Sequence, residues 1–350
     1  MRHNEGPHTF RIVEGSGSAS LHKLWAGLLT GPGPAAGCNM GMSAENRKQE
    51  LRRSGASKDF REVVWGRVSD YWTLTKPEVN FLVVISTLAG YYVALRGPLN
   101  FFVLMNTLMG TLMVASGTGT LNQYIERKSD ASMRRTARRP LPSGRIKAVE
   151  ALVFGILLAV GGGLLLWVTV NPLTSILALL TLTTYLLIYT PLKKRTALCT
   201  LVGAFPGAMP PLIGWAAARG SLNADSLVLY TILFLWQFPH FLAIAWMYRE
   251  DYSRAGLRML PPEDSDGLLT SIQIMAFLVA LVAVSMLPTL MGQMGKVYLF
   301  GATGLGAYFL VHGVRMARSR TNALARRLVL ASVLYLPLVF GLMMFDKIGL

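Results

Sequence analysis

The chain has 350 residues, of which 52% are hydrophobic and only 15% are charged, and its formal net charge is +16. The charges are unevenly distributed, so that long uncharged stretches alternate with short charged segments. This pattern excludes a soluble protein, because apolar helices in a soluble core would resemble one or two membrane spans but not a long series of them.

Residues 1–64 are predicted to form a disordered, basic cytoplasmic tail. The strings GSGSAS and GPGPAAG are flexible, low-complexity segments, and no apolar core of a secretory signal is visible. Glu5, Glu14 and the lack of an arginine-rich amphipathic stretch argue against a mitochondrial transit peptide. We therefore expect the inner (plasma) membrane of a bacterium rather than the mitochondrial inner membrane.

Residues 65–350 are predicted to form an all-α polytopic membrane domain, a bundle of nine transmembrane helices around a central cavity. A span needs about 20 apolar residues. The uncharged stretch 151–192 is too long for one helix, so we divide it at the turn signal Asn171-Pro172. The expected spans are 77–96, 101–123, 148–169, 172–190, 198–217, 226–247, 268–290, 297–314 and 328–345.

The basic residues predict that the N-terminus lies in the cytoplasm. With that orientation, the cytoplasmic segments hold 30 of the 34 lysines and arginines, as the positive-inside rule requires. The net positive charge is therefore explained by the orientation of the protein in the lipid bilayer, with the basic loops on the cytoplasmic side. We expect no nucleic-acid partner, because the charge lies in the loops of a membrane bundle.

The segment that follows the second span, LNQYIERKSDASMRRTARRPLP, carries the clearest functional signal. Asn122, Glu126 and Asp130 are four residues apart, so they share one face of a helix, and oxygen ligands of this kind suit Mg²⁺. Acids so close to the bilayer are functional candidates. The neighbouring arginines suit phosphate oxygens and are Arg134, Arg135, Arg138 and Arg139. The segment predicts a magnesium–phosphate site at the membrane edge and a lipid-like phosphate substrate.

Two other cytoplasmic segments add candidates. Lys193 and Lys194 follow the fourth span and are either snorkelling anchors or further cations for a diphosphate. Asp251 lies at the cytoplasmic end of the sixth span, where it can face the acids of the segment after the second span. His240 lies deeper in the same span, either as a hydrogen-bonding packing residue or in a functional role.

The fifth span is expected to be broken. Its string GAFPGAMPPLIGW, residues 203–215, contains three prolines and three glycines. Irregular backbone at membrane depth is tolerated only against protein or a cavity. The break predicts either a kink with small-residue packing or a wall of a substrate cavity, and the two are compatible.

At this point the residues resemble the UbiA superfamily of intramembrane prenyltransferases and, within it, the branch of protohaem IX farnesyltransferases (haem o synthases). The superfamily carries an N-x3-D-x3-D motif after its second span, which Asn122, Glu126 and Asp130 match with Glu for the middle Asp. The haem branch is indicated by the strings YWTLTKPEVNFLVVIST, PPLIGW, WQFPHF and YREDYSRAGLRMLP, and the resemblance covers residues 71–261. One departure is the second acid motif, in which Asp251 stands alone.

The resemblance implies that a farnesyl group passes from farnesyl diphosphate to the vinyl group of haem b. Water supplies the hydroxyl, and haem o and diphosphate are the products. It implies Mg²⁺ as cofactor, held by Asn122, Glu126, Asp130 and Asp251. The diphosphate would be bound by Arg134, Arg135, Arg138, Arg139, Lys193 and Lys194. His240 is a candidate haem-binding residue, as an iron ligand or beside a propionate. A haem a synthase is an expected partner, and the active site is expected on the cytoplasmic side.

Three alternatives remain open on sequence alone. A quinone-type prenyltransferase would act on an aromatic acid such as 4-hydroxybenzoate, which product analysis would reveal. A membrane transporter would suit the broken fifth span and the histidine, but the acids and arginines lie at one membrane face rather than at the midplane, and no inverted repeat is visible. An assembly factor without catalysis would leave the Mg²⁺-type cluster unexplained.

Overall fold

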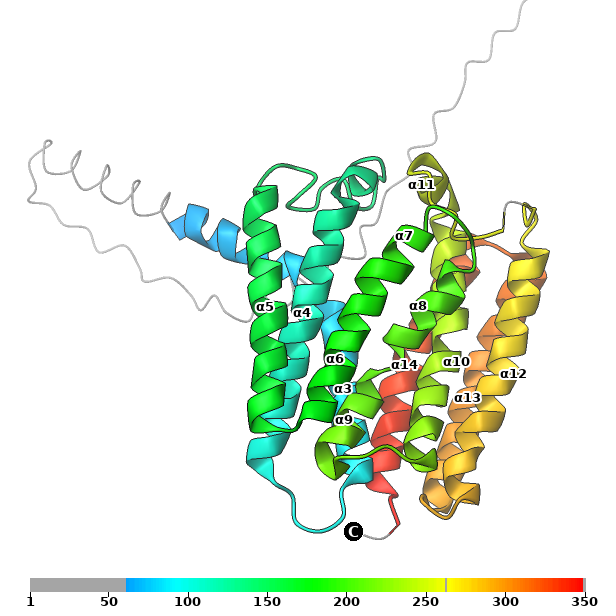
Figure 1. Cartoon of the computed structure of the whole chain (residues 1–350). Coiled ribbons are helices and arrows are strands. Elements are labelled where there is room, and N and C mark those ends of the chain that lie inside the picture. The colour runs from blue at the N-terminus through cyan, green and yellow to red at the C-terminus, as the bar shows by residue number, and fades with distance from the viewer. Residues whose placement is uncertain (1–60, 262, 349–350) are drawn as a thin grey trace, which may run out of the picture. The chain divides into compact units, whose positions relative to one another are not determined.

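The computed structural model describes residues 61–261 and 263–348, so most of the predicted tail, residues 1–64, lies outside the described residues. Residues 62–74 are helical and precede the named helices. In chain order these are α3 Pro77–Ala94, α4 Phe101–Ala131, α5 Ala148–Thr169, α6 Pro172–Thr184, the π-helical turn η1 Tyr185–Tyr189, α7 Thr190–Leu192, α8 Cys199–Gly207, α9 Pro210–Arg219, α10 Ala224–Met247, α11 Arg249–Arg254, α12 Leu268–Leu290, α13 Lys296–Ser319 and α14 Asn322–Phe345 (Figure 1).

The prediction of nine membrane-spanning helices is confirmed for the described residues. The fourth span consists of α6, η1 and α7, and the fifth consists of α8 and α9. Apart from an isolated bridge between Met294 and Lys347, the described residues form no β-structure. The chain is therefore an all-α, multi-pass membrane protein.

Three helices are longer than expected, and all three differences concern charged residues. Helix α4 continues to Ala131 instead of ending near 123. Helix α13 continues to Ser319 instead of ending at 314 and includes Arg315 and Arg318. Helix α14 begins at Asn322 rather than at 328 and includes Arg326 and Arg327. Long basic side chains extend from a helix end toward the membrane surface, so a charge does not end the helix that carries it.

Polar side chains at the helix starts explain several boundaries. The side chain of Asn100 accepts a hydrogen bond from the Val103 N–H at the start of α4. Asn171 caps α6 in the same way, directly before a proline at the first helical position. Asn223 begins α10 with a capping box. The turn predicted at Asn171-Pro172 is thus confirmed as a helix start.

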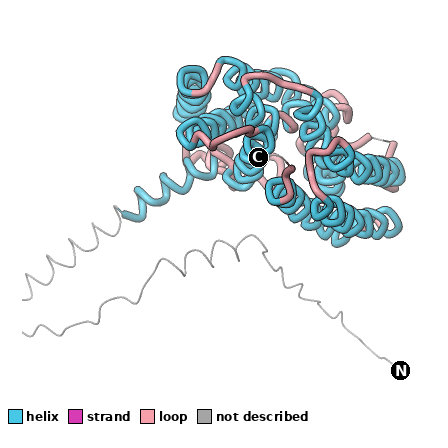
Figure 2. The backbone as a smooth tube through the Cα atoms, turned by 90° about the horizontal axis from the view of Figure 1, so that it is seen from below, coloured by secondary structure: helices cyan, strands magenta, loops and turns pink. Residues whose placement is uncertain are grey.

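Glycines let neighbouring helices approach closely, as expected for membrane helices. A Cβ on Gly90 of α3 would lie 2.1 Å from the backbone oxygen of Pro211 in α9. A Cβ on Gly117 of α4 would lie 2.7 Å from the backbone oxygen of Gly155 in α5. Figure 2 shows the helices nearly end-on, joined by loops. Close packing of α3 on α9 and of α4 on α5 therefore depends on glycine at these positions.

The predicted break in the fifth span is confirmed between α8 and α9. Helix α8 ends at Gly207, and α9 begins at Pro210. The side chain of Gln237 from α10 lies at this break and donates a hydrogen bond to the Ala204 oxygen over 3.1 Å. A Cβ on Gly207 would lie 2.0 Å from the Gln237 Oε1 atom. The small residue at the break therefore leaves space for a polar side chain of the next span.

Candidate functional site

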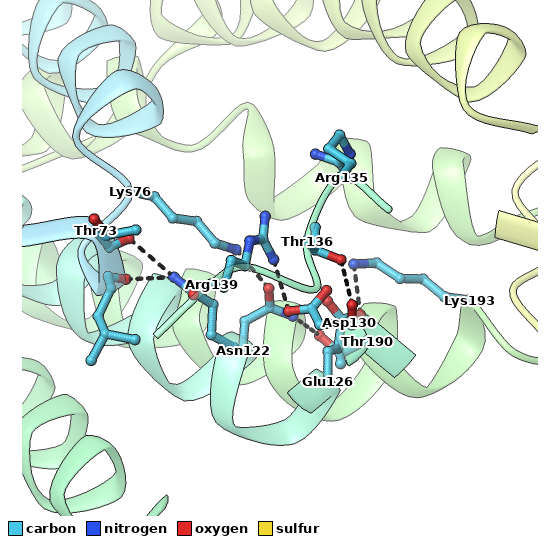
Figure 3. A network of polar contacts seen from close by, with 12 residues as sticks. Thr73, Lys76, Asn122, Glu126, Asp130, Arg135, Thr136, Arg139, Thr190 and Lys193 are labelled. Carbon is cyan, nitrogen blue, oxygen red and sulfur yellow. Dashed lines mark hydrogen bonds and ion pairs between the residues drawn. The ribbon is translucent and has the colours of Figure 1, made fainter. Parts of the chain in front are cut away.

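The three predicted oxygen ligands lie together on the C-terminal part of α4. Asn122, Glu126 and Asp130 follow one another at successive turns and share the face that points toward α7 and the following loop (Figure 3). Asn122 and Asp130 are each only 1% exposed. The one-face arrangement expected from their spacing is therefore present, because α4 remains helical through Ala131.

Each of the two acids of α4 is paired with a basic side chain. The Oδ2 atom of Asp130 accepts a hydrogen bond from Nη1 of Arg139 over 2.8 Å, and Oε1 of Glu126 accepts one from Nζ of Lys193 over 2.9 Å. Arg139 reaches back because the chain turns after α4, where the Thr136 hydroxyl donates to the Asp130 backbone oxygen over 2.9 Å. The loop and the fourth span thus supply one cation each.

Lys76 is a further cation that the sequence interpretation missed. Its Nζ atom donates to Oδ1 of Asn122 over 2.7 Å, and its backbone is left-handed, with φ 54° and ψ 62°, a strained conformation that is frequent at functional sites. Burial and, to a smaller extent, the nearby Arg139 lower the pKa of Lys76 to about 7, although Glu126 partly opposes the shift. The sequence did offer a signal for Lys76, because this residue directly precedes Pro77 within YWTLTKPEVNFLVVIST, one of the strings that indicate the haem branch.

Lys193 lies deeper than a snorkelling anchor would. It is 9% exposed, and its ammonium lies 4.5 Å from the centre of the Tyr189 ring, a cation–π contact. Burial alone lowers the pKa of Lys193, but the oxygens of Tyr189 and Tyr185 and the carboxylate of Glu126 outweigh this effect and raise it well above its ordinary value. The lysine is therefore charged at neutral pH.

Asp251 on α11 contacts the segment after α4, as its position in the sequence allowed. It is 8% exposed, and its Oδ2 atom accepts a hydrogen bond from the Arg135 backbone N–H over 3.3 Å. Arg254 forms an ion pair with Asp251. The guanidinium of Arg135 lies 5.0 Å from the centre of the Tyr248 ring. The second acid segment is thus joined to the first through the backbone and side chain of Arg135.

Three predicted diphosphate ligands do not join these contacts. Arg134, Arg138 and Lys194 are exposed. In the described part of the chain, none of their side chains donates a hydrogen bond to the carboxylates or the amide of the site. Among the described residues, the basic side chains that contact these groups are those of Lys76, Arg139, Lys193 and Arg254. Arg135 contacts Asp251 through its backbone N–H instead.

His240 is held by α14. Its Nδ1 atom lies 2.7 Å from the hydroxyl oxygen of Ser332, which donates its own hydrogen to the Val329 backbone oxygen over 2.6 Å. Because that hydroxyl has a single hydrogen, the geometry assigns the hydrogen of the first contact to Nδ1. The Trp236 ring stacks on the imidazole with 4.9 Å between ring centres. His240 therefore makes a hydrogen bond to a neighbouring helix, as a packing residue would, and its role toward haem stays a prediction.

The oxygen donors fit Mg²⁺ that is bound together with a phosphate substrate. The described residues contain no group of three histidine, cysteine or acidic residues that could hold a metal ion by itself. Mg²⁺ commonly keeps several waters and uses only one or two carboxylates together with substrate phosphates. Glu126 and Asp130 each use one carboxylate oxygen in the ion pairs described above. Their second oxygens are the donors suited to such a shared ion.

The chain is similar to known proteins along most of its length. The UbiA prenyltransferase family matches residues 83–337. A relative named protoheme IX farnesyltransferase from Solibacter usitatus is 50% identical over 290 residues, which is 80% of this chain and 99% of the relative. A relative of the same name from Koribacter versatilis is 43% identical and covers 79% of this chain and 93% of its own.

Solved structures show the same fold at low sequence identity. The structure of a digeranylgeranylglyceryl phosphate synthase is 17% identical, with a TM-score of 0.66 over 80% of this chain and 98% of that one. A UbiA homologue from Archaeoglobus fulgidus, bound to DMAPP and Mg²⁺, is 15% identical, with a TM-score of 0.60 over 78% of this chain and 99% of that one. The chain therefore belongs to the UbiA prenyltransferase family and is a prenyltransferase, as its motifs predicted.

Proposed function

We propose that the protein transfers the farnesyl group of farnesyl diphosphate to a vinyl group of protohaem IX (haem b), with addition of water, to give haem o and diphosphate. The observation that carries the proposal is the similarity to four proteins named protoheme IX farnesyltransferase, which are 40% to 50% identical over about four fifths of the chain. The ordered strings of the haem branch support the same choice.

The site supports chemistry in which a diphosphate leaves. Breaking the allylic C–O bond places negative charge on the diphosphate and positive charge on the prenyl carbon. Lys193, Arg139 and Lys76 come from three different segments and converge on one face of α4 (Figure 3). Positive groups fixed before the reaction stabilise charge that develops in it. Mg²⁺, when held by Asn122, Glu126, Asp130 and Asp251, would neutralise further charge on the leaving group.

The atoms balance without an oxidant or reductant. The bond from the first farnesyl carbon to oxygen breaks, and the diphosphate leaves with the electron pair. The terminal vinyl carbon of the haem forms the new C–C bond, which leaves the positive charge on the carbon beside the pyrrole ring. Water adds to that carbon and releases a proton. The apolar bundle would delay the attack of water until the C–C bond has formed.

For the acceptor, we propose that His240 faces the haem. With the hydrogen on Nδ1 donated to Ser332, the Nε2 lone pair is suited to haem iron, or to a hydrogen bond with a protonated propionate. The break between α8 and α9 would form a wall of the cavity that receives the substrates.

We also propose that the site opens to the cytoplasm at the inner membrane of a bacterium. The segment after α4 contacts the segment after α10 through Arg135 and Asp251. The segment after α10 contacts the segment after α7, where the Arg258 backbone N–H donates to the Lys193 oxygen over 2.7 Å. These are three of the segments that the positive-inside rule assigns to the cytoplasmic side. A haem a synthase would then be the partner that receives the product.

The experiment uses the full-length protein in proteoliposomes with haem b, farnesyl diphosphate and Mg²⁺, followed by haem extraction and mass analysis. Wild type is compared with Asp130→Ala. Haem carrying a hydroxyethylfarnesyl group from wild type alone would support the proposal. Farnesyl transfer to 4-hydroxybenzoate, with haem unchanged, would replace it with the quinone branch. Solute flux without any prenyl product would favour a transporter.

A further inference from the structure

A chain of hydrogen bonds crosses from the first span to the fourth through the Asn122 amide. Lys76 Nζ donates to Asn122 Oδ1 over 2.7 Å, and Asn122 Nδ2 donates to the Thr190 hydroxyl over 3.2 Å. The Thr190 hydroxyl donates to the Tyr185 backbone oxygen over 2.9 Å. Thr190 is 3% exposed, so water does not substitute for these partners. Figure 3 shows Thr190 beside the acids of α4.

The direction of each bond in this chain follows from its ends. Lys76 Nζ donates to the Asn122 oxygen, so the amide of Asn122 presents its oxygen to Lys76 and its NH₂ group to Thr190. The Thr190 oxygen then accepts, and its single hydrogen remains for the Tyr185 carbonyl. Thr190 therefore holds the Asn122 amide in the orientation that turns Oδ1 into the site, which is the orientation a metal ligand requires.

The π-helical turn η1 explains why a threonine reaches this position. Both the backbone N–H and the hydroxyl of Thr190 donate to the Tyr185 oxygen, five residues earlier. Such single π turns are frequent at functional sites. One turn further on, Lys193 contacts Glu126, which lies one turn after Asn122. Two successive turns at the end of the fourth span thus contact two successive turns of α4.

We propose that Thr190 is a positioning residue for the diphosphate and metal site, acting on the carbonyl oxygen of Asn122. The inference rests on the proposed function, because it takes Asn122 as an oxygen ligand. It predicts that the hydroxyl of Thr190, rather than its bulk, determines metal affinity.

The test compares Thr190→Val, which replaces the hydroxyl with a methyl group, with Thr190→Ser, which keeps it. Thr111→Val is the matched control. Thr111 lies on α4 and, like Thr190, is buried, with 2% exposure, but its hydroxyl has no hydrogen-bond partner in the described part of the chain. The first readout is Mn²⁺ binding, measured by electron paramagnetic resonance with an unreactive farnesyl thiolodiphosphate present. The second is the Mg²⁺ dependence of turnover.

Loss of a group that orients a metal ligand lowers metal affinity by about 10- to 100-fold, and we expect this for Thr190→Val in both readouts. Thr190→Ser and Thr111→Val should stay close to wild type. Mn²⁺ affinity in Thr190→Val equal to wild type would overturn the inference and leave farnesyl transfer standing. A selective loss in Thr190→Val with a non-haem product would support the inference and overturn the proposed acceptor. A wild type that binds no Mn²⁺ would overturn both the inference and the proposed metal site.

Discussion

Replacement of Lys193 by Met should lower both stability and activity, and the two effects can be separated. Loss of one partner of a buried ion pair costs about 3–5 kcal/mol. The side chains of Lys193 and Glu126 keep 11% and 12% exposure, and the Lys76 ammonium also acts on Glu126. We therefore expect a loss near the lower limit, about 3 kcal/mol. The double variant Lys193→Met/Glu126→Gln leaves no unpaired charge and should regain most of the stability.

Activity should not recover with stability, because the double variant lacks both the cation that we assign to the leaving diphosphate and the Glu126 carboxylate that we assign to Mg²⁺. We expect turnover to remain reduced by at least about 100-fold, the effect of removing one preorganised electrostatic partner. Thermal unfolding in detergent measures stability, and single-turnover farnesyl transfer in proteoliposomes measures the chemical step. A double variant that regains turnover in proportion to its stability would refute this reasoning, since Lys193 would then act only as the structural partner of Glu126.

Three further outcomes are expected. Asp130→Asn removes the charge but keeps the shape of the side chain, and should lower turnover by about 100- to 1000-fold; steady-state rates at saturating Mg²⁺ measure this, and a change below threefold would contradict it. Gly90→Ala brings a Cβ against the backbone of α9 and should destabilise the protein by at least about 1–3 kcal/mol. Gly341→Ala is the control, because an added Cβ there has no atom within 4 Å, and it should leave the stability unchanged. Equal unfolding temperatures of the two variants would count against the close packing of α3 on α9. His240→Ala should weaken haem binding in a spectrophotometric titration, and unchanged haem affinity and turnover would remove this residue from the site.

The spans could be predicted from the sequence because the cost of placing charge in lipid acts residue by residue. All nine spans appear within the described residues, and the expected starts at Pro77 and Pro172 are confirmed. The start of α14 was placed too late, because the sequence criterion took Arg326 and Arg327 as the end of a loop. Local composition shows where a span must be apolar, but it does not show how far a helix continues beyond the bilayer.

The candidate site was predictable where it depends on helix geometry. Asn122, Glu126 and Asp130 share a face because an α-helix returns to the same side every three to four residues, and this is evident from spacing alone. The sequence did not distinguish Arg139, which contacts Asp130, from the exposed Arg138 beside it. The path of the turns after α4 decides between these two residues, and hydrogen bonds within those turns determine that path.

The amino-acid sequence by itself determined the membrane class, the spans found among the described residues and the helix face that carries the predicted oxygen ligands, because each follows from local composition or from helical periodicity. The tertiary structure alone decided which cation meets which acid. Lys76 reaches Asn122 across 46 positions of the chain, and Lys193 reaches Glu126 across 67. Such contacts depend on close helix packing and on the π-helical turn that sets the register of the fourth span, and neither leaves a periodic signal in a single sequence.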